Sequence, residues 1–132
     1  MMKARSLMVI GVAGLIVAIA AGALAAAGKT TVEEMVFATG VDSRMPVGVA
    51  GEFDAATPRV VCWTKIATQS PPVTVRHVWH REGKRLLEVP LTVNYPAGRY
   101  WSIKNVTPGE WRVDVVNEAG EVLESKTFVV KP

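Results

Sequence analysis

From about residue 32 onwards, short segments rich in Val, Thr, Ile and aromatic residues alternate with polar breaks. Gly, Pro, Asn and Asp interrupt these segments roughly every 8 to 12 residues, a spacing typical of strands and turns in all-β domains. No amphipathic helical pattern competes with it in this part of the sequence. The pattern therefore predicts an all-β protein.

Eight strands are expected between the breaks, and the second of them is weak. They lie near Val32–Val41, Val47–Phe53, Arg59–Ala67, Val73–Glu82, Arg85–Tyr95, Arg99–Lys104, Glu110–Asn117 and Glu121–Val130. Hairpin turns are expected at Gly83 and Gly120, because glycine adopts a positive φ without a Cβ clash. Seven or eight short strands at this spacing predict a small immunoglobulin-like antiparallel β-sandwich, with a small barrel as the alternative.

Segment 42–58 fits this picture least well. It has little regular pattern and would be an unusually long loop for a small domain. Two interpretations stay open: either Val47–Phe53 is an edge strand, or the loop is functional.

The first 27 residues have the pattern of a targeting segment. Lys3 and Arg5 form a positive start, Leu7–Ala20 is apolar, and Ala23–Ala27 offers small-residue cleavage positions. We expect a signal peptide at 1–27, cleaved after Ala25 or Ala27. An uncleaved membrane anchor is the alternative, because the uncharged run is long enough to span a bilayer.

Residues 28–132 are expected to form a single β-sandwich domain, because about 100 residues suffice for one hydrophobic core. Both interpretations of the N-terminal segment place this domain outside the cytoplasm. The expected location is periplasmic or extracellular. In the alternative, the protein is anchored in the inner membrane and its domain faces the periplasm.

The charge pattern excludes some partners. The chain has 15 basic and 12 acidic residues, a net charge of +3, and loss of Lys3 and Arg5 would leave 13 against 12, or +1. A nearly neutral, interspersed pattern does not predict nucleic-acid binding. It also predicts membrane contact only through an uncleaved N-terminal segment.

The stretch VRHVWHREG, residues 75–83, concentrates chemistry-bearing side chains. Strand alternation places His77 and Trp79 on one face and His80 on the other. The two histidines therefore diverge, and no cysteine or carboxylate cluster accompanies them as zinc ligands would. We expect no metal and no cofactor.

No common catalytic motif appears in the sequence, so no catalytic residue is expected and the protein is interpreted as a non-enzyme. The alternative is a small hydrolase or metal-dependent enzyme using His77, His80 and Arg81. Cys62 is the only cysteine, which excludes an intrachain disulfide, and we expect its thiol to point inward as a small hydrophobic group.

Aromatic residues define both a core and a surface prediction. Residues flanked by alternating apolar positions are expected in the core between the sheets: Trp63, His77, Trp79, Trp111, Cys62 and Phe128. Trp101 is the best candidate for an exposed aromatic, because Arg99 shares its face. The residues expected at a binding surface are Trp101, Arg99, His80 and Arg81.

The order of these pieces resembles a bacterial domain-of-unknown-function family, number 2914, from about Val36 to Val130. The motifs are an H-x-W element at His77 and Trp79, a second element at Trp101-Ser102, and Gly109-x-Trp111. The resemblance implies a small all-β domain of exported or membrane-associated bacterial proteins, without an established activity. The sequence thus predicts an envelope-located β-sandwich that binds a protein or a glycan, or that serves as a structural accessory.

Overall fold

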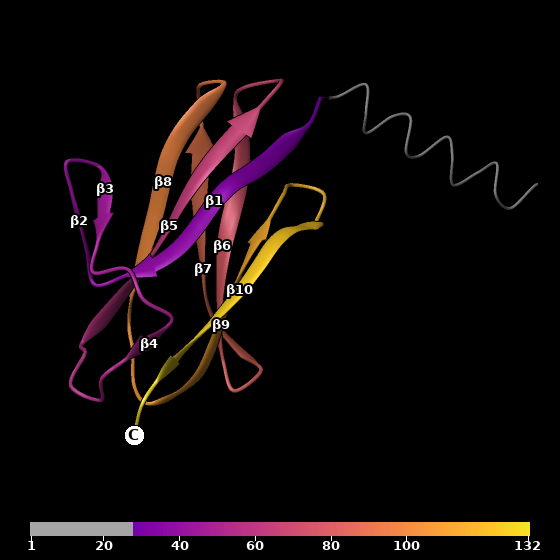
Figure 1. Cartoon of the computed structure of the whole chain (residues 1–132). Coiled ribbons are helices and arrows are strands. Elements are labelled where there is room, and N and C mark those ends of the chain that lie inside the picture. Colours follow the sequence, from indigo (N-terminus) through magenta and orange to yellow (C-terminus); the bar gives the residue numbers. More distant parts are fainter. Residues whose placement is uncertain (1–27) are drawn as a thin grey trace, which may run out of the picture.

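Ten β-strands make up the structure, a computed structural model that describes residues 28–132 (Figure 1). The expected signal peptide or anchor at 1–27 lies outside the described residues. The strands are β1 (Thr30–Ala38), β2 (Gly40–Asp42), β3 (Met45–Val47), β4 (Glu52–Phe53), β5 (Arg59–Thr68), β6 (Val73–Arg81), β7 (Lys84–Val93), β8 (Ala97–Asn105), β9 (Gly109–Val116) and β10 (Val122–Val130). A search of residues 28–132 for a helix capable of crossing a membrane finds none.

The strands form two open sheets and one small hairpin. One sheet has the order β1-β5-β8, the other has the order β4-β10-β9-β6-β7, and β2 pairs only with β3. All pairings are antiparallel except the short parallel contact of β4 with β10. The prediction of an all-β antiparallel sandwich is therefore confirmed, and a closed barrel is not what forms.

The order of the seven long strands is that of an immunoglobulin-like sandwich. The first, second and fifth of them, β1, β5 and β8, form one layer, whereas β6, β7, β9 and β10 form the other. Trp79, on the third long strand, is fully buried, which is the position of the core tryptophan in immunoglobulin domains. The β6–β7 hairpin turns at Glu82 and Gly83 with φ of 50° and 79°, as the sequence predicts for this glycine.

The core between the layers is organised around Phe128 of β10. Its ring centroid lies 4.5 Å from that of Phe37, 5.7 Å from Phe53, 6.2 Å from Trp79 and 5.8 Å from Trp111. These rings come from four other strands, and all of them are buried. Phe128 therefore joins both sheets and the short strand β4.

Segment 42–58 differs from the sequence prediction. The single strand expected at Val47–Phe53 does not form, because β3 ends at Val47 and Gly48 turns the chain with a φ of 74°. Phe53 is buried in the core and brings β4 against β10 as an edge strand. The preceding residues form the β2–β3 hairpin, which lies beside β8 in Figure 1.

Candidate functional site

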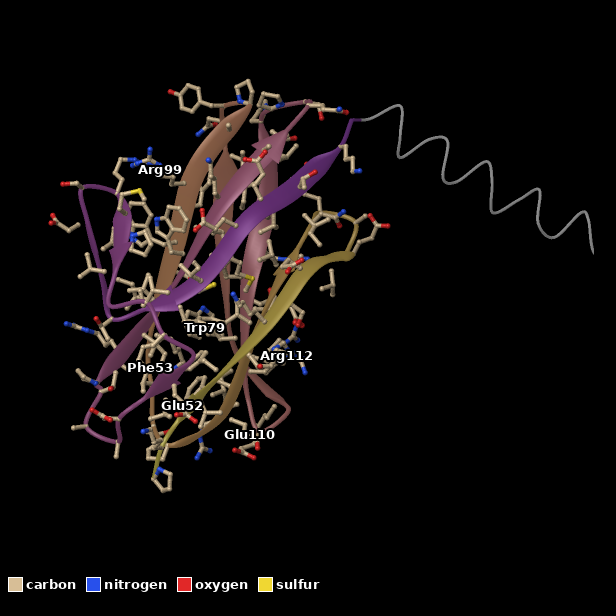
Figure 2. All side chains as sticks on the ribbon, in the orientation of Figure 1. Glu52, Phe53, Trp79, Arg99, Glu110 and Arg112 are labelled. Atoms are coloured by element: carbon tan, nitrogen blue, oxygen red, sulfur yellow. The ribbon has the colours of Figure 1, made fainter. Side chains whose placement is uncertain are left out.

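The four residues expected at a binding surface do not lie together. Trp101 and Arg99 belong to β8 of the three-stranded sheet, whereas His80 and Arg81 belong to β6 of the other sheet. Figure 2 shows Arg99 beside the β2–β3 hairpin and Arg112, the register partner of His80, on the opposite side of the molecule. The structure therefore does not bring these four binding candidates together on one surface.

Arg81 is engaged within the fold. Its Nε and Nη2 atoms donate hydrogen bonds to the carbonyl oxygen of Pro108, at 3.1 and 2.5 Å. Gly109 follows with a φ of 144°, and a Cβ built on it would lie 3.0 Å from Nε of Arg81. Arg81 therefore fixes the β8–β9 connection against the end of β6.

His80 lies on the outer face of the five-stranded sheet, with 12% of its side chain exposed. Its Nδ1 is 3.9 Å from Oδ2 of Asp114 and has no hydrogen-bond partner among the described residues. Asp114 also accepts hydrogen bonds from Nε of Arg112 at 3.1 Å and from Oγ of Ser125 at 2.6 Å. Asp114 thus neutralises Arg112 on this face.

His77 points the other way, into the core, where it links the two sheets. Its Nδ1 lies 2.7 Å from Oγ of Ser102, and its Nε2 lies 3.2 Å from Oγ1 of Thr64. Trp79 donates from Nε1 to Oγ of Ser102 at 3.0 Å, and Thr64 donates to the carbonyl of Tyr100 at 2.6 Å. Both partners of His77 belong to the three-stranded sheet, so the network is a polar connection across an otherwise apolar core.

The chemistry of the groups fixes the direction of every bond in this network. A carbonyl oxygen only accepts, so the Thr64 proton points to Tyr100 and Thr64 must accept from Nε2–H of His77. The Nδ1 atom of His77 is then an acceptor, and Ser102 donates to it while accepting from Trp79. In this one-way chain of hydrogen bonds, every donor and acceptor has a partner when the imidazole of His77 is neutral.

Burial reinforces the neutral state of His77. Loss of hydration lowers the pKa of its imidazole from 6.5 to about 4. The Ser102–His77 pair has the contact of a nucleophile with a general base, but both residues are buried in the core. The arrangement accounts for the H-x-W and Trp-Ser elements as parts of one structural network.

Cys62 also faces this core, from β5. It is the one cysteine of the described residues and is fully buried. Burial raises the pKa of its thiol, because a thiolate would lose its hydration there. The thiol is therefore held protonated and unreactive.

Trp63 requires a correction, because it does not lie between the sheets as expected. Strand alternation places Cys62 inward and Trp63 on the outer face of the three-stranded sheet. Only 1% of Trp63 is exposed nevertheless, and its Nε1 donates to the carbonyl of Arg44 at 3.0 Å. The β2–β3 hairpin therefore covers Trp63.

Arg44 also joins the hairpin to β8. Its guanidinium carbon lies 5.3 Å from the centre of the Trp101 ring, a cation–π arrangement. Its Nη2 donates to the carbonyl of Arg99 at 3.1 Å. Arg44 thus contacts Trp63, Trp101 and Arg99 at once, and these four residues define the candidate site.

The turn that presents Arg44 is a strained one. Asp42 pairs with Met45, so only Ser43 and Arg44 make the turn, with φ of 52° and 65°. Left-handed conformations cost non-glycine residues on the order of 1 kcal/mol each. Such strain persists where surrounding contacts compensate for it, and it is frequent at functional sites.

Apolar side chains surround this site without being covered. Met45 is 48% exposed, Val47 is 50% exposed and Ile103 is 51% exposed. Ile103 is two residues from Trp101 on β8, and therefore on the same outer face. The sequence predicts Trp101 and Arg99 as binding residues of this site, but no sequence pattern indicates the β2–β3 hairpin that completes it.

A surface hollow and the distribution of possible metal ligands give no second candidate site among the described residues. A hollow of about 730 Å³ lies between the β5–β6 and β9–β10 loops, but polar groups at its rim bond to one another, as Asn117 does to Glu121. No three His, Cys, Asp or Glu side chains among residues 28–132 gather closely enough to hold a metal ion.

Residues 72–130 match a family model described as "Protein of unknown function (DUF2914)". The resemblance to this family is confirmed for that segment. Comparison with curated proteins found no match. The DUF2914 match contains β6 to β10, and therefore His77, Ser102 and Trp101. It does not include Trp63 or Arg44, so the candidate site is built partly outside the matched segment, where the wider resemblance stays a prediction.

Proposed function

We propose that this protein is an exported, non-enzymatic β-sandwich domain of the bacterial cell envelope that binds a protein or glycan partner. In this proposal the domain is periplasmic or extracellular, either free after cleavage of the N-terminal segment or anchored through it. A purely structural accessory role is the second form of the proposal. Support for export comes from the charge and apolar pattern of residues 1–27.

The observation that carries the proposal is the contact of Arg44 with the partly exposed Trp101, outside the inter-sheet core. Tryptophan and arginine are the residues most often responsible for binding energy at interfaces, and methionine is enriched there. Here a strained hairpin turn brings these residue types together at the surface. Packing of the core between the sheets would not require these residue types on the outer face of the three-stranded sheet.

The enzymatic alternative receives less support from the geometry. His77 is buried between the sheets, His80 faces away on the outer surface, and Arg81 is occupied by the Pro108 carbonyl. A hydrolase or metal-dependent enzyme would need these groups to converge on a shared pocket. Binding through the outer face of the three-stranded sheet, which carries Trp101 and Arg44, agrees better with these positions.

Photo-crosslinking in intact cells tests this proposal. A photoreactive residue at position Ile103 should give a discrete adduct that is lost with Trp101→Ala. The matched control is the same probe at Leu86, which is 44% exposed but lies on β7 of the other sheet. Equal adducts at both positions, or none at Ile103, would contradict binding through this face.

A further inference from the structure

We infer that the partner of this face is a protein segment with an apolar centre and acidic ends. This inference rests on the proposed function and specifies the partner. The surface concerned is the outer face of the three-stranded sheet together with the β2–β3 hairpin, called the basic-aromatic face below.

The centre of the basic-aromatic face is apolar. Cross-strand pairing aligns Val61 with Ile103 and Trp63 with Trp101 on this face. Val61 and Trp63 are buried there, whereas Ile103 is exposed and Trp101 is partly exposed. The hairpin adds Met45, which is half-exposed. These pairs form two adjacent rows across the middle of the face, of which Ile103 and Trp101, together with Met45, are open to a partner.

Cations lie at both ends of these rows. Lys65 aligns with Arg99 beyond the tryptophan row, and Arg59 lies beyond the Val61–Ile103 row. Arg44 adds a fourth cation at the tip of the hairpin. Glu34, aligned with Lys65, is the carboxylate that the pairing of β1 with β5 brings to this face.

None of these four cations forms an ion pair within the described part of the chain. The other sheet behaves differently: Arg112 binds Asp114 at 3.1 Å and Arg85 binds Glu88 at 2.6 Å. Two arginines of that sheet are therefore neutralised by salt bridges, whereas the four cations of the basic-aromatic face form none within residues 28–132, although a carboxylate, Glu34, lies opposite one of them. An unpaired basic rim around an apolar centre is complementary to a partner with carboxylates at matching positions.

The composition of the centre favours a protein over a glycan. A sugar ring stacks on an aromatic surface, whereas the most exposed apolar side chains of this face are the aliphatic groups of Met45, Val47 and Ile103. Aliphatic and aromatic contacts at the centre with charges at the rim are the anatomy of a protein interface. The rim cations would accelerate association and set its orientation.

Selection from a display library tests this inference with a defined probe. Random twelve-residue peptides are selected on the full-length protein and counter-selected on its Trp101→Ala variant. We expect enriched peptides with Asp or Glu at both ends of an aliphatic or aromatic centre. Lys65→Glu and Arg99→Glu should each weaken binding of the enriched pool by about tenfold, and more strongly at low salt.

The matched control is Lys84→Glu, which makes the same charge change at an exposed position of the β6–β7 hairpin and should leave binding unchanged. Enrichment of neutral or basic peptides, no enrichment, or equal loss with Lys84→Glu would overturn the inference. The proposed function fails separately, through the crosslinks at Ile103. A crosslinked adduct that proves to be polysaccharide would preserve binding while overturning a protein partner.

Discussion

The hydroxyl of Ser102 donates to Nδ1 of His77 across 2.7 Å, and this contact joins the two sheets of the sandwich. It is one step of a chain in which each proton has one possible direction. A second proton on His77 would remove the acceptor that Ser102 uses. The neutral imidazole is therefore part of the folded structure.

This relationship predicts a dependence of stability on pH. The pKa of His77 is about 4 when folded and near its ordinary value of 6.5 when unfolded, so the unfolded chain binds a proton first as pH falls. The contribution of His77 is fully present above pH 6.5 and is lost between about pH 6.5 and 4. The expected loss is about 3 kcal/mol of unfolding free energy.

Urea unfolding at closely spaced pH values measures this dependence, with His77→Gln as the control that should lack the same slope. Nitrogen NMR of the imidazole gives an independent check, because it distinguishes the Nε2–H tautomer from the Nδ1–H tautomer. An Nδ1–H tautomer, or a ring protonated at pH 6, would contradict the one-way chain.

Removing the Ser102 hydroxyl should destabilise the protein more than its size suggests. In Ser102→Ala, Nδ1 of His77 and Nε1 of Trp79 both lose their partner in the core. A buried unsatisfied polar group costs about 1–3 kcal/mol, so the unfolding free energy should fall by about 2–6 kcal/mol for the two. Chemical denaturation of Ser125→Ala provides the comparison: this substitution removes one hydrogen bond, to Asp114 on the outer face, and should cost less than Ser102→Ala.

The sequence pattern was sufficient for the parts of the fold that depend on alternation and turns. Gly83 marks a hairpin because its backbone needs a positive φ, and alternation alone separates His77 from His80. The ring cluster around Phe128 could not be read in this way, because its members come from strands far apart in the chain. Such contacts depend on the order of strands within the sheets.

The candidate site was predicted only in part, for a local reason. The turn of the β2–β3 hairpin is Ser43-Arg44, which lacks the glycine or asparagine by which such turns are recognised. The apolar neighbours of Trp63 predict a core position, whereas its alternation with Cys62 places it on the opposite face of β5. What keeps it buried on that face is the hairpin, which the sequence did not reveal.

The N-terminal segment gives a prediction about processing. Cleavage at the small-residue positions should leave a mature protein that begins at Ala26 or Gly28. Mass spectrometry of the protein isolated from its native cells measures this terminus. Intact Met1 or Met2 in a membrane fraction would instead support the anchored form.

The buried Cys62 should be protected from thiol reagents in the native protein. Its side chain is inaccessible, and its raised pKa keeps the thiol protonated at neutral pH. Labelling should be slow in the folded state and rapid in denaturant, as measured by mass increase over time. Rapid labelling of the native protein would show that β5 presents the opposite face.

Arg44 should control how firmly the hairpin covers Trp63. The Arg44→Ala variant keeps the backbone carbonyl that accepts from Trp63 but loses the contacts with Trp101 and with the Arg99 carbonyl. Fewer contacts then stabilise the strained turn, so the hairpin should open more often. Nε1–H of Trp63 should therefore exchange with solvent faster. Indole N–H exchange by NMR measures this, and Nε1–H of Trp79, bonded to Ser102 in the core, is the internal control. Equal acceleration of both indoles would indicate global destabilisation, and unchanged exchange of Trp63 would show that Arg44 does not hold the hairpin closed.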